Sequence, residues 1–382
     1  MAIRKRAWKT GKGETKEAWV VDYKDQHGKR HLKTFSRKKD ATDWAVTAGH
    51  EVKHGVHTAA SASITVAEAG KLWADAAEKD GLEASTVRQY RQHQDLHIKP
   101  RLGNVKLSDL TAPMVKDFET WLRDNGRSPA MVRKVVSSLG SLLADALEHG
   151  RVARNVVRER PKKRRQQAQQ SRHKVRLEVG KDIPTAEEIN AALEGLEGHG
   201  RALFLTAARA GLRASELRAL RWSDVDFAKK VLHVRQRADR WNRIGALKSG
   251  AGRRDIPMTA MLVNTLKEWK LAYPRPFSAE VDKDGKPVRE APRPEHLVFP
   301  NGNGRVENHG NLYSRVFGPA WVAGGAAIDT GKKDEEGEPV LRPKYGIHAL
   351  RHFFASWLIN EKGRGGLEIS LKRAQVLLGH SS

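Results

Sequence analysis

The sequence predicts a multidomain α+β protein with a small β-hairpin and helix module, an all-α bundle, and a mainly α domain carrying a small antiparallel sheet. Three observations support this prediction. The chain has 382 residues, which suits two or three domains better than one. Apolar residues make up 39%, enough for packed cores. Strand-like runs occur at the N-terminus and in the C-terminal half, whereas helical periodicity fills the region between them.

The charge balance predicts a polyanionic partner. Lys and Arg number 70 against 45 Asp and Glu, a formal net charge of +25. Nucleic acid is the leading partner, and an anionic membrane surface is the weaker one. The absence of cysteine excludes disulfides, thiolate zinc sites and cysteine nucleophiles. Neither an 18-residue apolar run nor a secretion signal is found, so we expect a cytoplasmic protein without a membrane span.

Residues 1–60 form the predicted N-terminal module. Between Arg4 and Lys53 there are 14 Lys and Arg against 7 Asp and Glu, a net charge of +7. A basic hairpin and helix can dock on DNA, although a module that packs on its neighbour explains the pattern too. The expected elements are a strand over Ala18–Tyr23, a turn over Asp25–Gly28, a strand over His31–Phe35, and a helix from about Arg37 to Glu51 capped by Ser36.

Residues 64–157 form the predicted helical bundle. Thr65 with Glu68 is a capping box, and Pro113 and Pro129 follow the capping residues of two later helices. We expect Pro100 to stop the helix that begins near Ser85–Thr86. The apolar positions recur at helical spacing and therefore indicate a core.

Residues 158–181 are predicted to be a basic linker. They hold ten Lys and Arg against two acidic residues, a net charge of +8, without periodicity. A solvated segment is the plain interpretation, and a strap on a phosphate backbone is the one we favour because the linker joins two basic domains. The expected DNA-binding residues are Arg158, Arg160, Lys162, Lys163, Arg164 and Arg165.

Residues 182–382 form the predicted C-terminal domain. Thr185 with Glu188 is a helix-initiating capping box. We expect a small sheet from Val231–Val234, a stretch around Lys248, and Arg254–Pro257. Residues 275–295 and 328–340 are rich in turn-forming and charged residues and are expected to be exposed loops.

Four segments of this domain carry polar groups that a packed core would not select. Gly211-Leu212-Arg213 precedes Glu216, so a part-buried Arg213 needs either this carboxylate or a substrate phosphate as its partner. Lys248 lies before a glycine-rich turn that lacks the order of a Walker P-loop. His348 and Arg351 share a helix face, and His380 follows Gly379 after an apolar helix. His348 and His352 lack the glutamate of a zinc protease motif, so no metal and no cofactor is expected.

Taken in this order, the segments resemble the tyrosine recombinases, the phage integrase family of site-specific DNA recombinases. The resemblance is carried by the Gly-Leu-Arg-x-x-Glu-Leu turn, a Lys on a hairpin, the His-x-x-Arg helix and the Leu-Gly-His. It covers about 185–382, the helical block is similar to the family's core-binding domain, and the N-terminal module is similar to arm-type DNA-binding domains. It implies a catalytic set of Arg213, Lys248, His348, Arg351 and His380, supported by Glu216.

The family reaction implied by this resemblance is a transesterification through a 3′-phosphotyrosyl intermediate. It implies double-stranded DNA with core-type and arm-type sites, a tetrameric synapse of protomers, a DNA-bending host factor and a directionality factor as partners, in the nucleoid of a bacterial host. In the family the nucleophilic Tyr follows the Leu-Gly-His. The five tyrosines of this sequence all precede His380, so we expect a chain that ends before that Tyr, has no nucleophile of its own, and binds DNA without cutting it.

Other classes of function remain open from the sequence. A non-catalytic, sequence-specific DNA-binding remnant or regulator of recombination has the same pocket without the attacking group. A basic RNA-binding protein is opposed by the lack of an RNP-type aromatic motif. A metal-dependent nuclease would need a carboxylate cluster that the sequence does not show.

Overall fold

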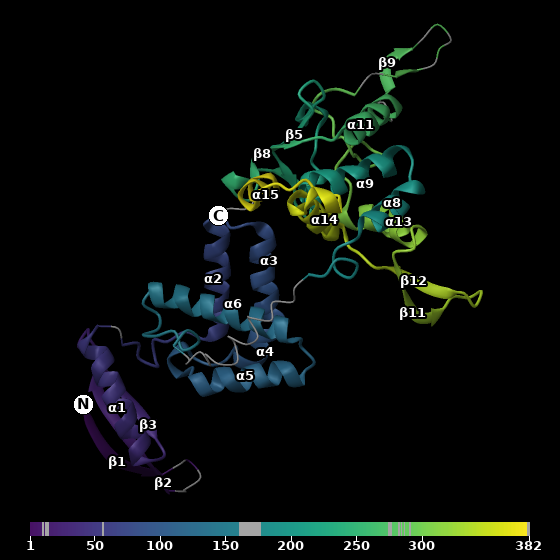
Figure 1. Cartoon of the computed structure of the whole chain (residues 1–382). Helices are drawn as coiled ribbons and strands as arrows, with labels where there is room; N and C mark the ends of the chain where they lie inside the picture. The colour runs from purple at the N-terminus through teal and green to yellow at the C-terminus, as the bar shows by residue number, and fades with distance from the viewer. Residues whose placement is uncertain are drawn as a thin grey trace. The chain divides into compact units, whose positions relative to one another are not determined.

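The computed structural model describes residues 1–9, 11, 15–55, 57–159, 177–273, 277–281, 283, 285, 287–289 and 292–379. The chain divides into two units, Met1–Gln169 and Gln170–Ser382, and each is described by itself (Figure 1). Among the residues described, no helix is both long and apolar enough to cross a membrane.

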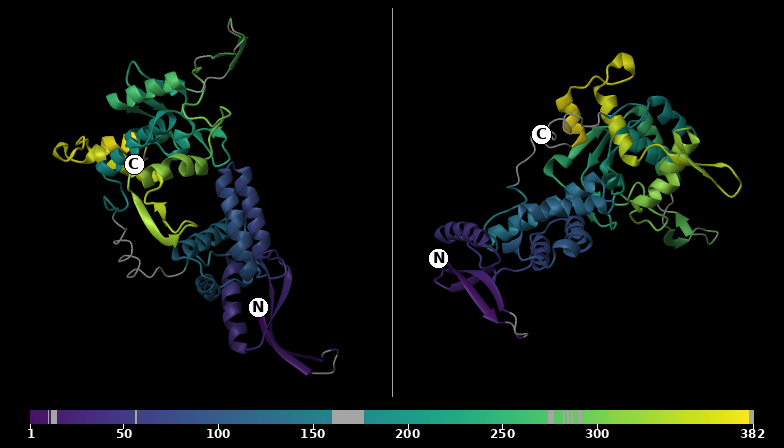
Figure 2. Two further views of the ribbon diagram at one scale, coloured as in Figure 1. Left: turned by 90° about the vertical axis from the view of Figure 1, so that its right-hand side faces the viewer. Right: turned by 90° about the horizontal axis from the view of Figure 1, so that it is seen from below.

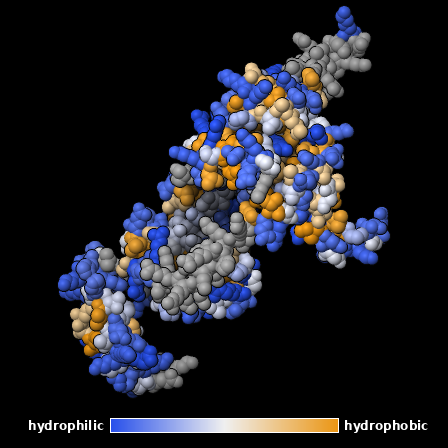
Figure 3. Space-filling model, in the orientation of Figure 1, coloured by the Kyte–Doolittle hydropathy of each residue, from blue (hydrophilic) through white to orange (hydrophobic). Residues whose placement is uncertain are grey.

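An antiparallel sheet in the order β1-β2-β3 opens the first unit, with α1 against one face (Figure 2). The core between them includes Val21, Tyr23 and Ala41, while hydrophilic residues cover most of the face seen in Figure 3. The predicted hairpin is therefore an incomplete description, because β1 adds a third strand. The prediction that Ser36 caps the helix α1 is wrong. Arg37 is its N-cap residue, and the Arg37 side chain makes no capping hydrogen bond. The elements are β1 Ala2–Lys9, β2 Thr15–Lys24, β3 Arg30–Phe35 and α1 Lys38–Lys53.

A helical bundle follows in the same unit. The capping box of Thr65 and Glu68 is confirmed, as are the caps Thr111 and Ser128 ahead of their prolines. Phe118 and Leu139 are fully buried at its centre. The elements are α2 Val66–Lys79, α3 Ala84–His93, η1 Gln94–Ile98, α4 Lys99–Leu102, η2 Leu107–Asp109, α5 Ala112–Asp124 and α6 Pro129–Glu148.

Pro100 does not stop its helix, contrary to the sequence prediction. The π-helical turn η1 precedes it, and the amide of Lys99 donates to the carbonyl of Gln94. A π-turn shifts the hydrogen-bond register by one residue. The helix can therefore accommodate the following proline, which has no backbone N–H to donate. The chain then continues helically to Leu102.

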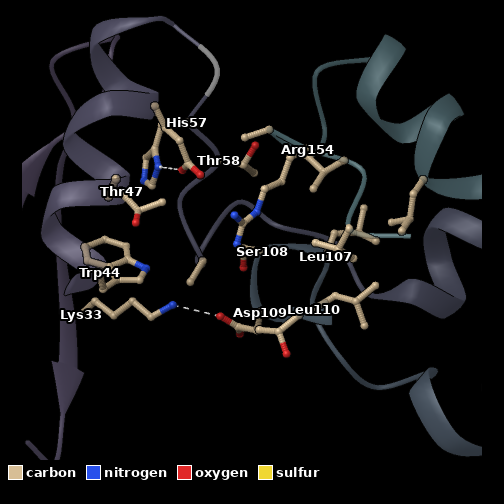
Figure 4. A pocket seen from close by; sticks show the side chains of 18 of the residues that line it. Lys33, Trp44, Thr47, His57, Thr58, Leu107, Ser108, Asp109, Leu110 and Arg154 are labelled. Carbon is tan, nitrogen blue, oxygen red and sulfur yellow. Dashed lines mark hydrogen bonds and ion pairs between the residues drawn. The ribbon is translucent and has the colours of Figure 1, made fainter. Parts of the chain in front are cut away.

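The N-terminal module meets the bundle at a pocket of about 390 Å³. Lys33 of β3 lies 2.9 Å from Asp109 of η2, and Trp44 and His57 line the same pocket (Figure 4). The His57 imidazole is held between Glu51 at 2.9 Å and the Tyr23 hydroxyl. The Lys33–Asp109 pair thus joins the module to the bundle, while the polar cluster around His57 lies within the module.

The second unit is built around α9, whose residues Ala202–Ala208 are all buried. Helices α11 and α14 both pack on α9, and the fully buried Phe204 of α9 contacts the rings of Phe317 and Trp321. The capping box of Thr185 and Glu188 is confirmed. The helices are α8 Ala186–Glu194, α9 Gly198–Ala210, α10 Ala214–Leu217, η3 Trp222–Asp224, η4 Gly250–Gly252, α11 Ala260–Ala272, α12 His309–Leu312, η5 Tyr313–Phe317, α13 Gly318–Ala323, α14 Ile347–Ile359, η6 Lys362–Arg364 and α15 Leu371–Leu378.

The strands of this unit form a three-stranded sheet, β4-β5-β8, and three separate hairpins. Strands β5 and β8 coincide with the predicted ones, but Lys248 lies in the loop after β7 rather than in a strand. Within the described residues, each of the two predicted loops contains a strand pair instead, β9-β10 and β11-β12; the hydrophilic tip of β11-β12 is visible in Figure 3. The strands are β4 Val225–Asp226, β5 Val231–Val234, β6 Arg237–Ala238, β7 Ile244–Gly245, β8 Arg254–Pro257, β9 Phe277–Val281, β10 Pro287–Arg289, β11 Ala327–Lys333 and β12 Pro339–Pro343.

Candidate active site

The turn between α9 and α10 places Arg213 and Glu216 together. Gly211 has φ of +56°, and a Cβ at this position would lie 2.2 Å from the Phe354 ring, so only glycine fits. Arg213 then caps α10: its amide donates to Glu216 Oε2 at 2.9 Å and its Nη1 to Oε1 at 2.8 Å. The Arg213 side chain is 38% exposed, whereas the Glu216 side chain is 3% exposed. The guanidinium therefore keeps one side open to solvent.

Arg254 is a site residue that the sequence analysis missed. It lies on β8, its side chain is 1% exposed, and its Nη2 donates to Glu216 Oε2 at 2.8 Å. Its Nε also donates to the carbonyl of Leu377, at the end of α15, at 2.8 Å. The signal was the strand alternation, because Arg254 faces inward like Ile256 while Asp255 faces out.

Glu216 thus serves two guanidiniums. Burial would raise the pKa of its carboxyl group, but the hydrogen bond and charge of Arg254, together with Arg213, outweigh burial and lower this pKa. Glu216 therefore stays ionised. A buried carboxylate between two arginines orients both side chains and neutralises only part of their charge.

Arg351 approaches the same turn from α14. It is 4% exposed, its Nη1 donates to the Gly211 carbonyl at 2.7 Å, and its Nη2 donates to the Leu378 carbonyl. Its pKa is lowered to about 10, chiefly by burial and then by the positive charge of Arg213, while Glu216 opposes the shift. The guanidinium remains protonated at neutral pH.

The end of α15 closes over this cluster. Arg213 Nη2 lies 3.3 Å from the carbonyl of Gly379, and Arg351 and Arg254 hold the two preceding carbonyls. Gly379 has φ of +64°, and a Cβ there would lie 3.0 Å from both the Ala251 carbonyl and Arg254 Nη1. Three guanidiniums and one carboxylate therefore meet the last described turn with an excess of two positive charges.

Of the remaining predicted residues, His348, Lys248 and Arg158 are described and exposed, and the others lie outside the described residues. His348 is exposed on the first turn of α14, one turn before Arg351 and His352. Its ring lies 4.7 Å from that of His352, whose pKa is lowered by burial and then by Arg351. Lys248 is exposed in the loop between β7 and η4. His380 lies outside the described residues, as do Arg160, Lys162, Lys163, Arg164 and Arg165; Arg158 is described and exposed.

A metal site is not found among the described residues, where no group of three or more His, Asp or Glu could hold an ion. The cluster instead offers guanidinium donors, which match the oxygens of a phosphate in geometry and charge. The unit is mainly helical with a small sheet, and its guanidinium cluster has the chemistry to bind a phosphate group.

Comparison with known sequences identifies the family. Residues 184–382, more than half of the chain, match the phage integrase family. A tyrosine recombinase XerC-like protein of Caldanaerobacter subterraneus is 24% identical over 410 residues, covering 100% of this chain and 93% of that protein. The prophage integrase IntR of Escherichia coli is 30% identical over 237 residues, covering 61% of this chain and 52% of IntR. The chain belongs to the phage integrase family of tyrosine recombinases.

Known structures show the same fold. The integrase of transposon Tn1549, in complex with transposon right end DNA, has a TM-score of 0.60 at 18% identity, covering 84% of this chain and 92% of that one. A lambda integrase tetramer bound to a Holliday junction has a TM-score of 0.54 at 19% identity, covering 98% and 95%. The multidomain α+β architecture predicted from the sequence is thereby confirmed.

Proposed function

We propose that this protein is a site-specific DNA recombinase of the phage integrase type. The observation that supports it most is the meeting of Arg213 and Arg351 at the Gly211 turn, with Glu216 and Arg254 behind them. Two fixed guanidiniums match the non-bridging oxygens of a phosphodiester. They stabilise the charge that develops there during attack, which is the work that a metal ion does in other enzymes.

The remaining roles follow from the chemistry of phosphodiester exchange. Lys248 protonates the departing 5′ oxygen. His348 acts as a general base or hydrogen-bond donor near the nucleophile, and His380 binds a non-bridging oxygen. The nucleophile is a Tyr that becomes linked to the 3′ phosphate, and the free 5′-hydroxyl of another strand reverses the step. The exchange conserves bond energy, so it requires no cofactor.

The nucleophilic Tyr is not among the five tyrosines of these 382 residues. The Tyr345 hydroxyl donates to Glu188 at 2.7 Å, and burial raises its pKa. The Tyr273 hydroxyl donates to the Leu297 carbonyl, and the pKa of Tyr23 is raised to about 12, chiefly by burial. Tyr90 stacks on Trp73 and Tyr313 donates to the Tyr345 carbonyl. Because these contacts hold the tyrosines in other roles, they favour a second candidate function for a polypeptide of these 382 residues, that of a non-catalytic DNA-binding regulator of recombination.

The partners we propose are double-stranded DNA and other copies of this chain. The N-terminal module, residues 1–60, would bind arm-type DNA. The bundle of residues 64–157 and the C-terminal domain of residues 182–382 would bind core-type DNA. The basic linker of residues 158–181 would bind the phosphate backbone between them. A tetrameric synapse, a DNA-bending host factor and a directionality factor complete the proposal.

Selection from a pool of random duplexes tests this function. The full chain is expected to enrich one defined sequence and to protect it from nuclease against excess mixed-sequence DNA. Replacing Arg213 and Arg351 with Gln should weaken protection at the central phosphates of that sequence. Binding without any sequence enrichment would overturn site-specificity, and preference for RNA over duplex DNA would overturn the substrate class.

A further inference from the structure

The first turn of α14 carries His348, and this end of the helix has no side-chain cap of its own. Gly346 is the N-cap residue and makes no capping side-chain hydrogen bond. The β11-β12 hairpin that leads into it is largely exposed. Because a helix end without capping partners is prone to fray, the direction of this turn must be set by the residues between the hairpin and Gly346.

Glu188 of α8 holds the two residues in this position. Its Oε1 accepts from Lys344 Nζ at 2.8 Å, and its Oε2 accepts from the Tyr345 hydroxyl at 2.7 Å. Tyr345 is 2% exposed, and its ring packs edge-on against Trp321 with the ring centres 5.1 Å apart. The Lys344 amide donates to the Ala326 carbonyl at 3.0 Å. One carboxylate therefore fixes two consecutive residues whose surroundings are also packed.

Glu188 is itself held in place, which distinguishes this contact from an ordinary surface ion pair. Its Oε2 also accepts from the amide of Thr185 at 2.9 Å, as part of the capping box of α8. Burial would raise the pKa of Glu188, but the hydrogen bonds from Lys344, the Thr185 amide and Tyr345 outweigh burial and lower this pKa. An ionised acceptor strengthens all three hydrogen bonds, whereas an exposed pair of single side chains contributes little.

We propose that Glu188 is a positioning residue of the phosphate site, which holds the start of α14 so that this helix presents His348 to the DNA backbone. The inference rests on the proposed function, because His348 receives its role near the nucleophile there. Arg351, one turn further along α14, has its own anchors in the carbonyls of Gly211 and Leu378. Loss of the Glu188 contact should therefore affect His348 more than Arg351.

Tyr345→Phe tests the contact, because it removes one hydroxyl and leaves the capping box of α8 intact. Amide hydrogen exchange of the DNA-free chain should become faster in residues 346–349. The matched control is Tyr273→Phe, which removes another buried hydroxyl of the same unit, bonded at 2.8 Å to the Leu297 carbonyl. The control should leave exchange in residues 346–349 unchanged.

The duplex that the full chain selects from the random pool supplies the second measurement. Tyr345→Phe should bind this duplex several-fold more weakly, and Tyr273→Phe should bind it like the unaltered chain. Adding Tyr345→Phe to His348→Gln should cause no further loss, whereas adding it to Arg213→Gln should cause its full loss again. A contact that only stabilises the fold would give the same loss in both backgrounds.

Glu188→Gln tests the other side of the same contact. It should weaken binding about as much as Tyr345→Phe, and the two changes together should cost no more than the larger one alone. Glu187→Gln removes the neighbouring, exposed charge of α8 and should bind like the unaltered chain. Additive losses from Glu188→Gln and Tyr345→Phe would overturn the action of the two residues through one contact.

The outcomes separate the positioning role from the proposed function. A chain that selects no duplex would overturn the proposed function and the positioning role with it. A chain that selects its duplex normally but keeps its affinity after Tyr345→Phe would overturn the positioning role alone, whatever the exchange shows. An equal loss of affinity in Tyr273→Phe would show a general effect of stability and would likewise overturn it.

Discussion

Arg254 and Glu216 form a salt bridge in which both side chains are almost fully excluded from solvent, with Nη2 2.8 Å from Oε2. The same carboxylate holds Arg213, whose other face is open to solvent. Arg254 also holds the end of α15 through the Leu377 carbonyl. One buried arginine therefore connects the α9-α10 turn, strand β8 and the segment that leads to His380.

Arg254→Gln is expected to destabilise the chain by about 3–5 kcal/mol, because it leaves the carboxylate of Glu216 buried with one arginine instead of two. Denaturant unfolding followed by circular dichroism measures the change. Arg253→Gln is the matched control, since Arg253 is exposed on the neighbouring position of the chain. Equal stability of the two variants would mean that the buried pair contributes little.

The linker should contribute several phosphate contacts. Replacing Lys162, Lys163, Arg164 and Arg165 with Ala should flatten the log–log salt slope of DNA binding by about 2–4. A strap that lies on the backbone loses these contacts directly. An unchanged slope would show that the linker is only solvated.

A control with the same charge loss makes the linker result specific. Four exposed lysines of the second unit can be replaced with Ala together, and this variant should keep the original slope. They are Lys229, Lys267, Lys332 and Lys333.

The pKa shifts of two buried histidines predict that the helical bundle becomes less stable to unfolding at acidic pH. Burial lowers the pKa of His93 and of His97, and neighbouring positive charges lower each further. The pKa of each histidine in the folded state lies below the unfolded value of about 6.5. The contribution of the two neutral histidines to the stability of the fold is therefore complete above about pH 6.5 and is lost as the pH falls below it. Unfolding by urea should require less denaturant at about pH 5.5 than at about pH 7.5.

His93→Gln should reduce this pH dependence, since Gln keeps a polar group near Ser138 but does not titrate. His149→Gln changes an exposed histidine at the end of α6 and should leave the pH dependence as it is. A pH dependence that is identical in both variants would assign the effect to other groups.

The N-terminal module should be needed for a second kind of DNA sequence. A chain that begins at Ser61 loses Lys33 and its contact with Asp109, but it keeps the bundle's capping box at Thr65. We expect it to select the core-type sequence with unchanged affinity and to lose the second class. Selection from random duplexes, run in parallel on both chains, measures this, and identical selections would make the module structural.

The sequence predicted the residues whose position is set locally. The Gly-Leu-Arg turn brings Arg213 and Glu216 together over three residues, and the helix spacing relates His348 to Arg351. Arg254 was missed because its burial depends on a partner 38 residues away. A buried arginine has no local signature except, for Arg254, the alternation of its strand.

The hairpin β11-β12 and strand β1 were missed for a related reason. Both are largely exposed, so neither has the alternating apolar face that predicts a strand. Their partners come from backbone pairing: Ile3 faces Val21 in the first sheet and Ile328 faces Arg342 in the second. Charge-rich strands of this kind are readily taken for loops.

The last prediction is that a polypeptide of these 382 residues binds DNA but forms no covalent adduct with it. In the proposed mechanism Arg213, Arg351 and Lys248 stabilise charge and move a proton, yet a tethered nucleophile is needed as well. Water lacks the orientation of a tethered group, which can be worth about 7–11 kcal/mol. A nicked suicide duplex with gel detection measures the adduct.

The same chain continued into a Tyr-bearing segment should form the covalent adduct, and changing that Tyr to Phe should abolish it. An adduct mapped to Tyr345 or to another of the five tyrosines would contradict the prediction. Failure of the continued chain to react would favour the non-catalytic regulator.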